Sequence, residues 1–272
     1  METKELHVER PLDRYVPSAT QSSHLKQAEA MAVNRCLRTL GYSKHPLEET
    51  SHPKRELNIF EFYFFPEAGK RGYYFPEENL GDMGWDDAVP ATQRMLLDGT
   101  TASYRGHPVP EGGCYGDAGR QLTRGAKPPR KFEESGMTIS RVADASPRGL
   151  LESYVSVIRQ ALSYQIRQDT RIKRVISEWS ACMKSQGYSY KSPAEAVNDE
   201  RWRQAGNDKT SRDEIATATA DMDCKKRVRY LDIVVAVETA YENRYIKQHS
   251  GRMKEFLDLR ESWDQNAKQV IR

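Results

Sequence analysis

Apolar residues recur at helical spacing through most of the second half of the chain. One apolar stripe begins at Pro147, which Ser146 precedes as a candidate N-cap, and continues almost without a break to Gly187. The stripe comprises Leu151, Tyr154, Ile158, Leu162, Ile172, Val175, Trp179 and Cys182. This pattern predicts a long amphipathic helix that ends at Gly187.

A second stripe follows a loop that holds a short helix within residues 192–204. Ser211 and Glu214 have the spacing of a capping box, which marks the start of a helix. Gly251 is a candidate kink within the stripe that follows. Its apolar and aromatic members are Ile215, Ala218, Met222, Val228, Leu231, Val235, Tyr241, Tyr245, Phe256, Leu259, Trp263, Ala267 and Val270.

The two stripes are predicted to pair as a long antiparallel hairpin. Leu150 precedes Cys182 by the same number of residues as Phe256 follows Cys224. At 1.5 Å per helical residue, both positions lie about 48 Å from those cysteines and should face each other.

The first half of the chain has weaker patterning. Residues 1–20 contain Pro11 and Pro17 and are expected to form an extended lead-in. A helix is predicted over about 22–40, ended by Gly41, and short helices are predicted over 90–99 and from Cys114. Between them, the aromatic segments "IFEFYFF" and "GYYF" are predicted to form a short β-hairpin.

These elements together predict a mainly α fold. We expect a disulfide-linked long antiparallel helical hairpin over residues 147–272 and a smaller α-rich N-terminal region over 21–130, after the lead-in at 1–20. Gly, Pro and Lys residues over 125–146 indicate a linker between the two halves.

A short motif occurs twice. Residues 36–43 read "CLRTLGYS" and residues 182–190 read "CMKSQGYSY". In each copy a cysteine precedes a Gly-Tyr-Ser that should end a helix, and one further cysteine follows downstream. This symmetry favours the pairs Cys36–Cys114 and Cys182–Cys224 among the three pairings that four cysteines allow. Four buried reduced thiols are the alternative, and a duplication that relates the two halves is a hypothesis.

Charge and composition narrow the class of protein. The 272 residues carry a net charge of +3, which is too weak to indicate a nucleic-acid partner. No apolar run approaches the roughly 18 residues of a membrane span, and the first residues contain no apolar segment typical of a signal peptide. The chain is therefore expected to be either cytoplasmic or a mature exported protein without its leader.

Motifs for catalysis, cofactors and metals are scarce. The sequence contains no phosphate-binding loop, nucleophile elbow or zinc-protease motif, so we expect no cofactor and no metal. Asp86 and Asp87 are candidate paired carboxylates, although charges at a helix start explain them better. The glycines of "PEGGCYGDAG" suit either an anion cradle or a close backbone approach beside a disulfide, and the second interpretation is favoured.

Two groups of residues are candidates for ligand contact. An aromatic surface for a sugar or peptide would use Phe62, Tyr63, Tyr73, Tyr74 and Trp85, although ordinary core packing is the simpler interpretation. Contact with an anionic partner would use the cations near the second cysteine pair, which are Lys184, Arg201, Arg203, Lys225, Lys226 and Arg227.

The segments "WSACMKSQGYSY", "ATADMDCKKRVRYLDIVVAVETAYENRYI" and "VPEGGCYGDAGRQL" resemble a group of actinobacterial extracytoplasmic proteins. These proteins are helical and often lipoproteins, with Cys-Met-x-x-x-Gly-Tyr followed by a second cysteine and a long amphipathic helix. The resemblance extends patchily from Cys36 to Tyr245 and is best from Trp179 onwards. It implies an exported, disulfide-bonded protein and no catalytic residues, whereas the leader and lipid-bearing cysteine of the group are absent here.

We therefore predict an extracytoplasmic protein, either secreted or lipid-anchored, that binds a protein or a cell-envelope polymer and is not an enzyme. An envelope-acting hydrolase that uses Asp86 and Asp87 is one alternative, and a cytoplasmic helical adaptor with reduced thiols is another. The sequence gives no oligomeric state.

Overall fold

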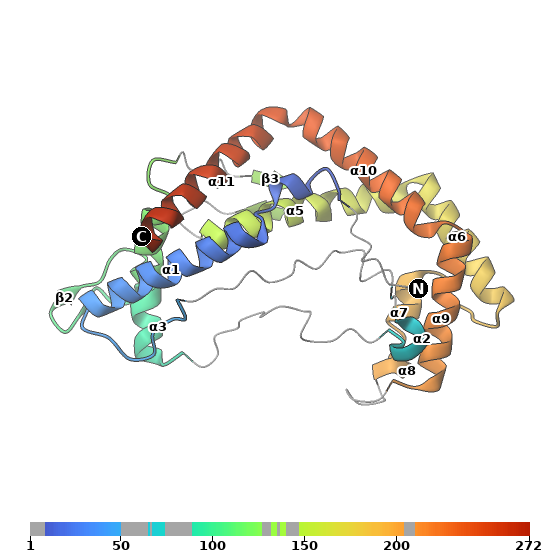
Figure 1. Ribbon diagram of the computed structural model, residues 1–272, viewed down its shortest axis with the longest axis horizontal. Coiled ribbons are helices and arrows are strands. Elements are labelled where there is room, and N and C mark those ends of the chain that lie inside the picture. The colour runs from blue at the N-terminus through green and yellow to red at the C-terminus, as the bar shows by residue number, and fades with distance from the viewer. Residues whose placement is uncertain are drawn as a thin grey trace. The chain divides into compact units, whose positions relative to one another are not determined.

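The structure, a computed structural model, describes residues 9–49, 65, 67–73, 89–126, 132–134, 137–139, 147–203 and 210–272. The predicted fold class is confirmed, because the described chain is mainly helical (Figure 1) and contains two disulfides and short antiparallel strand pairs. The predicted disulfide pairs are also correct. Cys36 bonds to Cys114 and Cys182 bonds to Cys224, so no cysteine is a free thiol.

The chain divides into two compact units, each assembled from three segments. Unit 1 consists of Met1–Pro11, Glu56–Gly81 and Leu162–Tyr245. Unit 2 consists of Leu12–Arg55, Asp82–Ala161 and Ile246–Arg272. Neither unit coincides with one of the regions predicted from the sequence, because both helical stretches of the second half contribute to both units.

Unit 2 is built around α1 (Ala19–Thr39), which packs against α4 (Gly113–Leu122) and α11 (Ser250–Ile271). The 3₁₀ turn Asp13–Tyr15, α3 (Ala91–Asp98) and the first part of α5 (Pro147–Gln168) complete its helices. Around the first disulfide the core is apolar and comprises Ala32, Val33, Leu37, Leu40, Leu96, Leu97 and Ala118.

Unit 1 is built around α6 (Thr170–Ser185) and α9 (Arg212–Arg227), which the second disulfide joins. The short helices α2 (Ala68–Arg71) and α7 (Pro193–Val197) pack against α9, α8 (Glu200–Arg203) follows α7, and α10 (Tyr230–Gln248) follows α9. The core of this unit includes Phe65, Tyr73, Ile172, Val175, Trp179, Met183, Ala196, Ala218, Met222, Val234 and Val237.

The two copies of the repeated motif end their helices with the same hydrogen bonds. Gly41 and Gly187 have φ angles of 75° and 90°, in the left-handed region that glycine adopts without strain. After the first, the N–H of Tyr42 donates to the carbonyl of Leu37 at 2.9 Å. After the second, the N–H of Tyr188 donates to the carbonyl of Met183 at 3.0 Å. Both ends are Schellman motifs, with the cysteine one residue before the accepting carbonyl.

The two predicted stripes contact each other inside each unit. In unit 1 the hydroxyl of Tyr241 donates to Asp169 at 3.3 Å, and in unit 2 the rings of Tyr154 and Phe256 stack at 3.8 Å. The prediction that Phe256 meets the start of the first helix is therefore confirmed to within about one helical turn.

The prediction of nearly unbroken helices was wrong. The first stripe is interrupted at Asp169, whose carboxylate accepts the N–H of Arg171 and begins α6 as an N-cap. The second is interrupted at Arg229, which has a φ of 55°, and at His249, two residues before the expected kink at Gly251. Because this N-cap starts a new helix directly after the previous one, the apolar spacing continues across Asp169. The apolar pattern therefore gave no sign of the interruption.

The predicted β-hairpin lies largely outside the described residues. Its described parts include Ala68–Arg71, which form α2, and Gly72 and Tyr73, which form a turn. The observed strand pairs are β1 (Ser103–Tyr104) with β2 (His107–Pro108), and β3 (Phe132–Glu134) with β4 (Met137–Ile139). The sequence predicted neither pair, because strands this short have no detectable apolar alternation.

The glycine-rich segment before Cys114 serves backbone packing. A Cβ atom added to Gly113 would lie 2.2 Å from the carbonyl oxygen of Leu97. The start of α4 therefore touches the end of α3 so closely that only glycine fits, as the favoured interpretation of this segment predicted.

Candidate functional site

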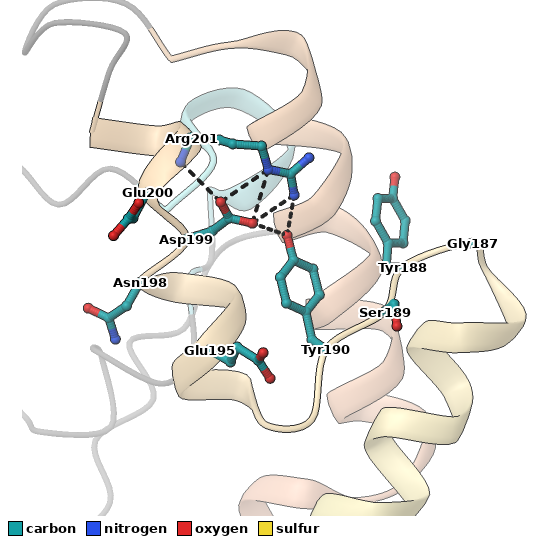
Figure 2. A pocket seen from close by; sticks show the side chains of 9 residues that line it. All are labelled: Gly187, Tyr188, Ser189, Tyr190, Glu195, Asn198, Asp199, Glu200 and Arg201. Carbon is teal, nitrogen blue, oxygen red and sulfur yellow. Dashed lines mark hydrogen bonds and ion pairs between the residues drawn. The ribbon is translucent and has the colours of Figure 1, made fainter.

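The candidate site is an open pocket in unit 1, formed by the loop after α6 together with α7 and the start of α8 (Figure 2). Its volume is about 800 Å³. Its lining comprises Gly187, Tyr188, Ser189, Tyr190, Glu195, Asn198, Asp199, Glu200 and Arg201.

Local hydrogen bonds fix the loop that carries the tyrosines. The Schellman motif at Gly187 sets the direction of the chain, and the hydroxyl of Ser180 donates to the carbonyl of Tyr190 at 2.6 Å. The next helix, α7, begins at Ser192, whose side chain accepts the N–H of Glu195. The pocket is thus built on the disulfide-bonded end of α6.

Tyr190, Asp199 and Arg201 form the central polar network of the pocket. The hydroxyl of Tyr190 donates to Asp199 Oδ2 at 2.7 Å, and Arg201 Nη2 donates to the same oxygen at 2.7 Å. Arg201 Nη2 also donates to the Tyr190 hydroxyl at 2.6 Å. Figure 2 shows the three side chains converging on one point at the pocket wall. We call this set the Tyr190–Asp199–Arg201 network.

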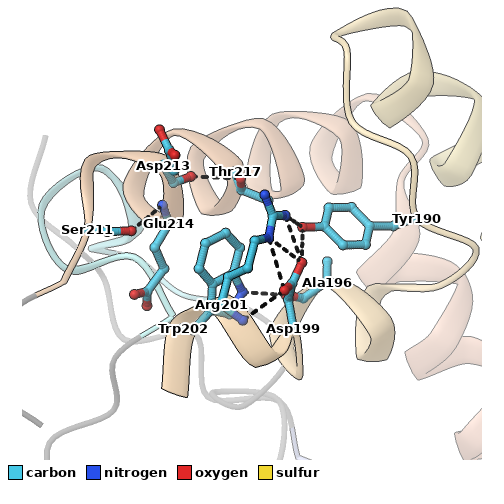
Figure 3. Close-up of polar contacts among 9 residues, drawn as sticks. All are labelled: Tyr190, Ala196, Asp199, Arg201, Trp202, Ser211, Asp213, Glu214 and Thr217. Atoms are coloured by element: carbon cyan, nitrogen blue, oxygen red, sulfur yellow. Dashed lines mark hydrogen bonds and ion pairs between the residues drawn. The ribbon is translucent and has the colours of Figure 1, made fainter. Parts of the chain in front are cut away.

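The opposite side of Arg201 rests on an aromatic anchor. The guanidinium carbon lies 4.8 Å from the ring centroid of Trp202, within cation–π range. Trp202 is in turn held by its indole N–H, which donates to the carbonyl of Ala196 at 2.7 Å (Figure 3). Behind it, Tyr73 lies 6.3 Å away, measured between ring centroids.

Figure 3 also shows the start of α9 beside this anchor. Ser211 accepts the N–H of Glu214 at 3.1 Å, as a capping box requires. The Glu214 carboxylate, however, accepts the N–H of Tyr73 at 3.0 Å and is buried, so we find the predicted box only in part. Glu214 thereby holds the segment of Phe65 and Tyr73 against α9.

The network fixes the protonation states of its members. Hydrogen bonds from Arg201 hold the pKa of the Asp199 carboxyl well below its usual range. Burial, and then the hydrogen bond to Asp199, raise the pKa of Tyr190 to about 12. At neutral pH the first group is an anion and the second a neutral phenol.

A second polar cluster lies in the core of unit 1. Asp221 and Lys225 form an ion pair of 2.8 Å within α9, and their side chains are 0% and 1% exposed. The indole of Trp179 donates to Asp221 at 2.8 Å, and the Lys225 ammonium lies 5.8 Å from the ring centroid of Phe65. Burial raises the pKa of Asp221 and lowers that of Lys225. No solvent reaches this pair, so its role is structural.

The predicted aromatic surface is mostly untested. Phe62, Tyr63, Tyr74 and Trp85 lie outside the described residues, as do Asp86 and Asp87. Tyr73 is described and is only 7% exposed, with its ring 5.3 Å from that of Phe65. Its assignment as a ligand contact was therefore wrong, because the ring is part of the core.

The predicted cationic group is divided by the structure. Lys184, Lys226 and Arg227 are exposed near the second disulfide. Lys225 is buried against Asp221, so its assignment to a surface contact was wrong. Arg201 is exposed but paired with Asp199, and the side chain of Arg203 lies outside the described part. On α9, Lys225 differs from Lys226 and Arg227 because it lies on the face of the helix that is buried in the core.

Sequence reasoning missed Tyr188, Tyr190, Asn198 and Asp199 as site residues. A signal was present, because the second copy of the motif carries a further tyrosine after Gly-Tyr-Ser that the first copy lacks. The two-residue spacing of Asp199 and Arg201 also matches a carboxylate that caps a helix start and binds the arginine beside it. The fold was needed to bring that pair to Tyr190.

The described residues lack two further features. They contain no group of three or more His, Cys, Asp or Glu side chains arranged to hold a metal ion. Within the same residues, no helix combines the length and apolar character needed to cross a bilayer.

No protein-family model matches this chain, and no curated protein or solved structure matches it either.

Proposed function

We propose that this chain is an exported protein that binds a component of the cell envelope, either a polymer or a protein, in the pocket beside the second disulfide. Two disulfides support export, because such bonds persist in oxidising compartments and are rare in the cytosol. The resemblance of the motifs around both pairs to exported actinobacterial proteins supports the same compartment.

The Tyr190–Asp199–Arg201 network is the observation that carries the proposal of binding. A catalytic acid or base works best when its pKa lies near the working pH. Here Asp199 stays ionised and Tyr190 stays protonated through the neutral range. The network therefore offers a fixed set of donors and acceptors, which suits recognition better than proton transfer.

The pocket is also well placed for recognition. The Schellman motif, the second disulfide and the anchor at Trp202 fix the backbone that carries the lining residues. Ligand binding therefore costs little conformational entropy of the protein. Tyr188, half-buried at the edge, supplies the apolar area that most ligand pockets need.

The exposed cations near the second disulfide form a separate surface. The exposed side chains of Lys184 and Arg227 would contact an anionic envelope polymer outside the pocket. Such exposed charges would guide approach and add weakly to affinity, and their effect would fall with salt.

The proposal is tested by retention of the purified, oxidised protein on immobilised envelope material. Tyr188→Ala should weaken retention about tenfold, the loss expected for one aromatic anchor. Tyr164→Ala removes a tyrosine that is 67% exposed and lies outside the pocket, so this matched control should bind normally. Equal retention of wild type and Tyr188→Ala would exclude the pocket as the binding site.

Export is tested separately. Intact-mass analysis of natively produced protein after alkylation should show no modified cysteine. Four alkylated thiols would contradict export.

A further inference from the structure

The charge balance of the pocket disfavours an anionic ligand. Glu195, Asp199 and Glu200 supply three carboxylates and Arg201 supplies the single cation of the lining. That cation is already engaged, since its Nη2 lies 2.7 Å from the Asp199 carboxylate. A phosphate or carboxylate entering here would meet net negative charge and no uncompensated cation.

The free hydrogen-bonding positions are mixed in kind. Arg201 uses Nε and Nη2 toward Asp199 and Tyr190, which leaves the Nη1 donors of a side chain that is 60% exposed. Asn198 uses its amide N–H toward the carbonyl of Ala194 at 2.8 Å, which leaves its side-chain oxygen as an acceptor. Hydroxyl groups, which both donate and accept, match such alternating positions.

Tyr188 adds an aromatic face to these polar groups. Its backbone is held by the bond to Met183, and Figure 2 shows its ring standing apart from the Tyr190–Asp199–Arg201 network, at the edge of the pocket. The face of an aromatic ring is negative and attracts the weakly positive C–H groups on the flat side of a sugar ring. An aromatic face beside a paired carboxylate and guanidinium is therefore complementary to a pyranose.

We propose that the pocket binds a neutral, hydroxyl-rich sugar unit of a glycan and does not bind polyanions. The sugar ring covers Tyr188 while its hydroxyls bond to Arg201, and Asn198, on the far side of Tyr190 in Figure 2, is left to a further unit of the glycan. Glu195 and Glu200 are exposed, so water screens their charge and they contribute little to affinity. This inference rests on the proposed function, because it names the ligand class of the same pocket.

The test uses two oligosaccharides with the same ring skeleton and a polyanion. Calorimetry with the oxidised full chain would compare a trimer of N-acetylglucosamine, a trimer of glucosamine and a polyglycerol phosphate. The neutral trimer should bind, and Tyr188→Ala should weaken it about tenfold, while Tyr164→Ala leaves it unchanged. Glu200→Gln should change its affinity by less than about twofold.

Three results would overturn the inference. One is pocket-dependent binding of the polyanion without the neutral trimer. Another is preference for the glucosamine trimer together with a loss of more than about fivefold in Glu200→Gln, which would indicate an ammonium site. The third is no binding of any probe. In the third case, retention on envelope material that is still lost in Tyr188→Ala would show that the proposed function stands and only the ligand class is wrong.

Discussion

The two disulfide-bonded helix ends share a backbone and differ in what surrounds it. In both, a cysteine precedes a Schellman motif. The side chain two positions before the cysteine donates a hydrogen bond to a backbone carbonyl of the loop after the helix. Asn34 donates to the carbonyl of Leu47 at 2.9 Å, as Ser180 donates to that of Tyr190 at 2.6 Å. The hydrogen-bonded scaffold is therefore the same in the two units.

The polar groups beside each scaffold are of different kinds. In unit 2, Tyr42 donates to Gln93, which donates to the carbonyl of His45, and Gln93 is 1% exposed. In unit 1 the polar groups beside the scaffold are the buried, neutral phenol of Tyr190 and the ion pair of Asp199 with Arg201, whose guanidinium is 60% exposed. A neutral, closed network is suited to stability, whereas a charged, open one leaves groups available to a ligand. Of the two helix ends, only the one at Gly187 therefore has groups suited to binding a ligand.

Removing each disulfide should have the largest effect on stability and should distinguish the two ends. The chain-entropy relation gives about 4.5 kcal/mol for the separation of 78 residues between Cys36 and Cys114, and about 3.9 kcal/mol for the 42 residues between Cys182 and Cys224. Double Cys→Ser variants, followed by urea unfolding, should lose similar free energies of unfolding.

Ligand binding should separate these variants. Only loss of Cys182–Cys224 should weaken binding at the pocket, because Tyr188 and Tyr190 directly follow that helix end. Equal loss of binding in both variants would show that the two ends do not differ in function.

Lys225→Met should have the next largest effect. It leaves the Asp221 carboxylate in the core without its ion-pair partner, which costs about 3–5 kcal/mol. The double variant Asp221→Leu with Lys225→Met removes both charges and should recover most of that free energy, since apolar pairs of similar volume replace buried ion pairs well. Urea unfolding of the three proteins measures this, and a double variant no more stable than the single one would contradict it.

Much of this architecture could be predicted from the sequence, for identifiable reasons. Gly-Tyr after an apolar stripe marks a helix end by local chemistry alone, so both helix ends were predicted. The repetition of the motif, with one cysteine downstream of each copy, then predicted both disulfides. Lys225 could not be placed, because adjacent Lys225 and Lys226 point to different environments once α9 packs. The pocket depends on Tyr190 meeting Arg201 across α7, which is a tertiary contact that no local pattern encodes.

Paired Tyr→Phe substitutions should show opposite effects at the two ends. Tyr42→Phe removes a bond to the buried Gln93, and a buried acceptor left without a partner costs about 1–2 kcal/mol. Tyr190→Phe should cost less than about 1 kcal/mol, because Asp199 keeps Arg201 and can bind water. Ligand affinity should fall only in Tyr190→Phe. Thermal unfolding and calorimetry measure the two effects, and the reverse order of stabilities would contradict the contrast.

The smallest expected effect is a pH dependence of stability. It should come from the Tyr190–Asp199–Arg201 network in unit 1, because Gln93 in the network of unit 2 does not titrate. Asp199 has a folded pKa below its ordinary 3.8, so its contribution to stability is present above that pH and is lost as the pH falls further. Tyr190 has a folded pKa raised from 10.0 to about 12, so its contribution is present below pH 10 and is lost as the pH rises toward 12. Between these limits pocket stability should be constant.

Ultraviolet difference titration of wild type against Tyr190→Phe isolates the phenol of Tyr190 and should place its ionisation near pH 12. Asp199→Asn is the matched control, because it removes the carboxylate that accepts the hydroxyl and so lowers the pKa of Tyr190 toward its ordinary value. An ionisation near pH 10 in wild type would mean that Tyr190 is neither buried nor hydrogen-bonded to Asp199 in solution. The charged network would then be no more fixed than any exposed side chains, and the contrast with the closed end at Tyr42 would lose its basis.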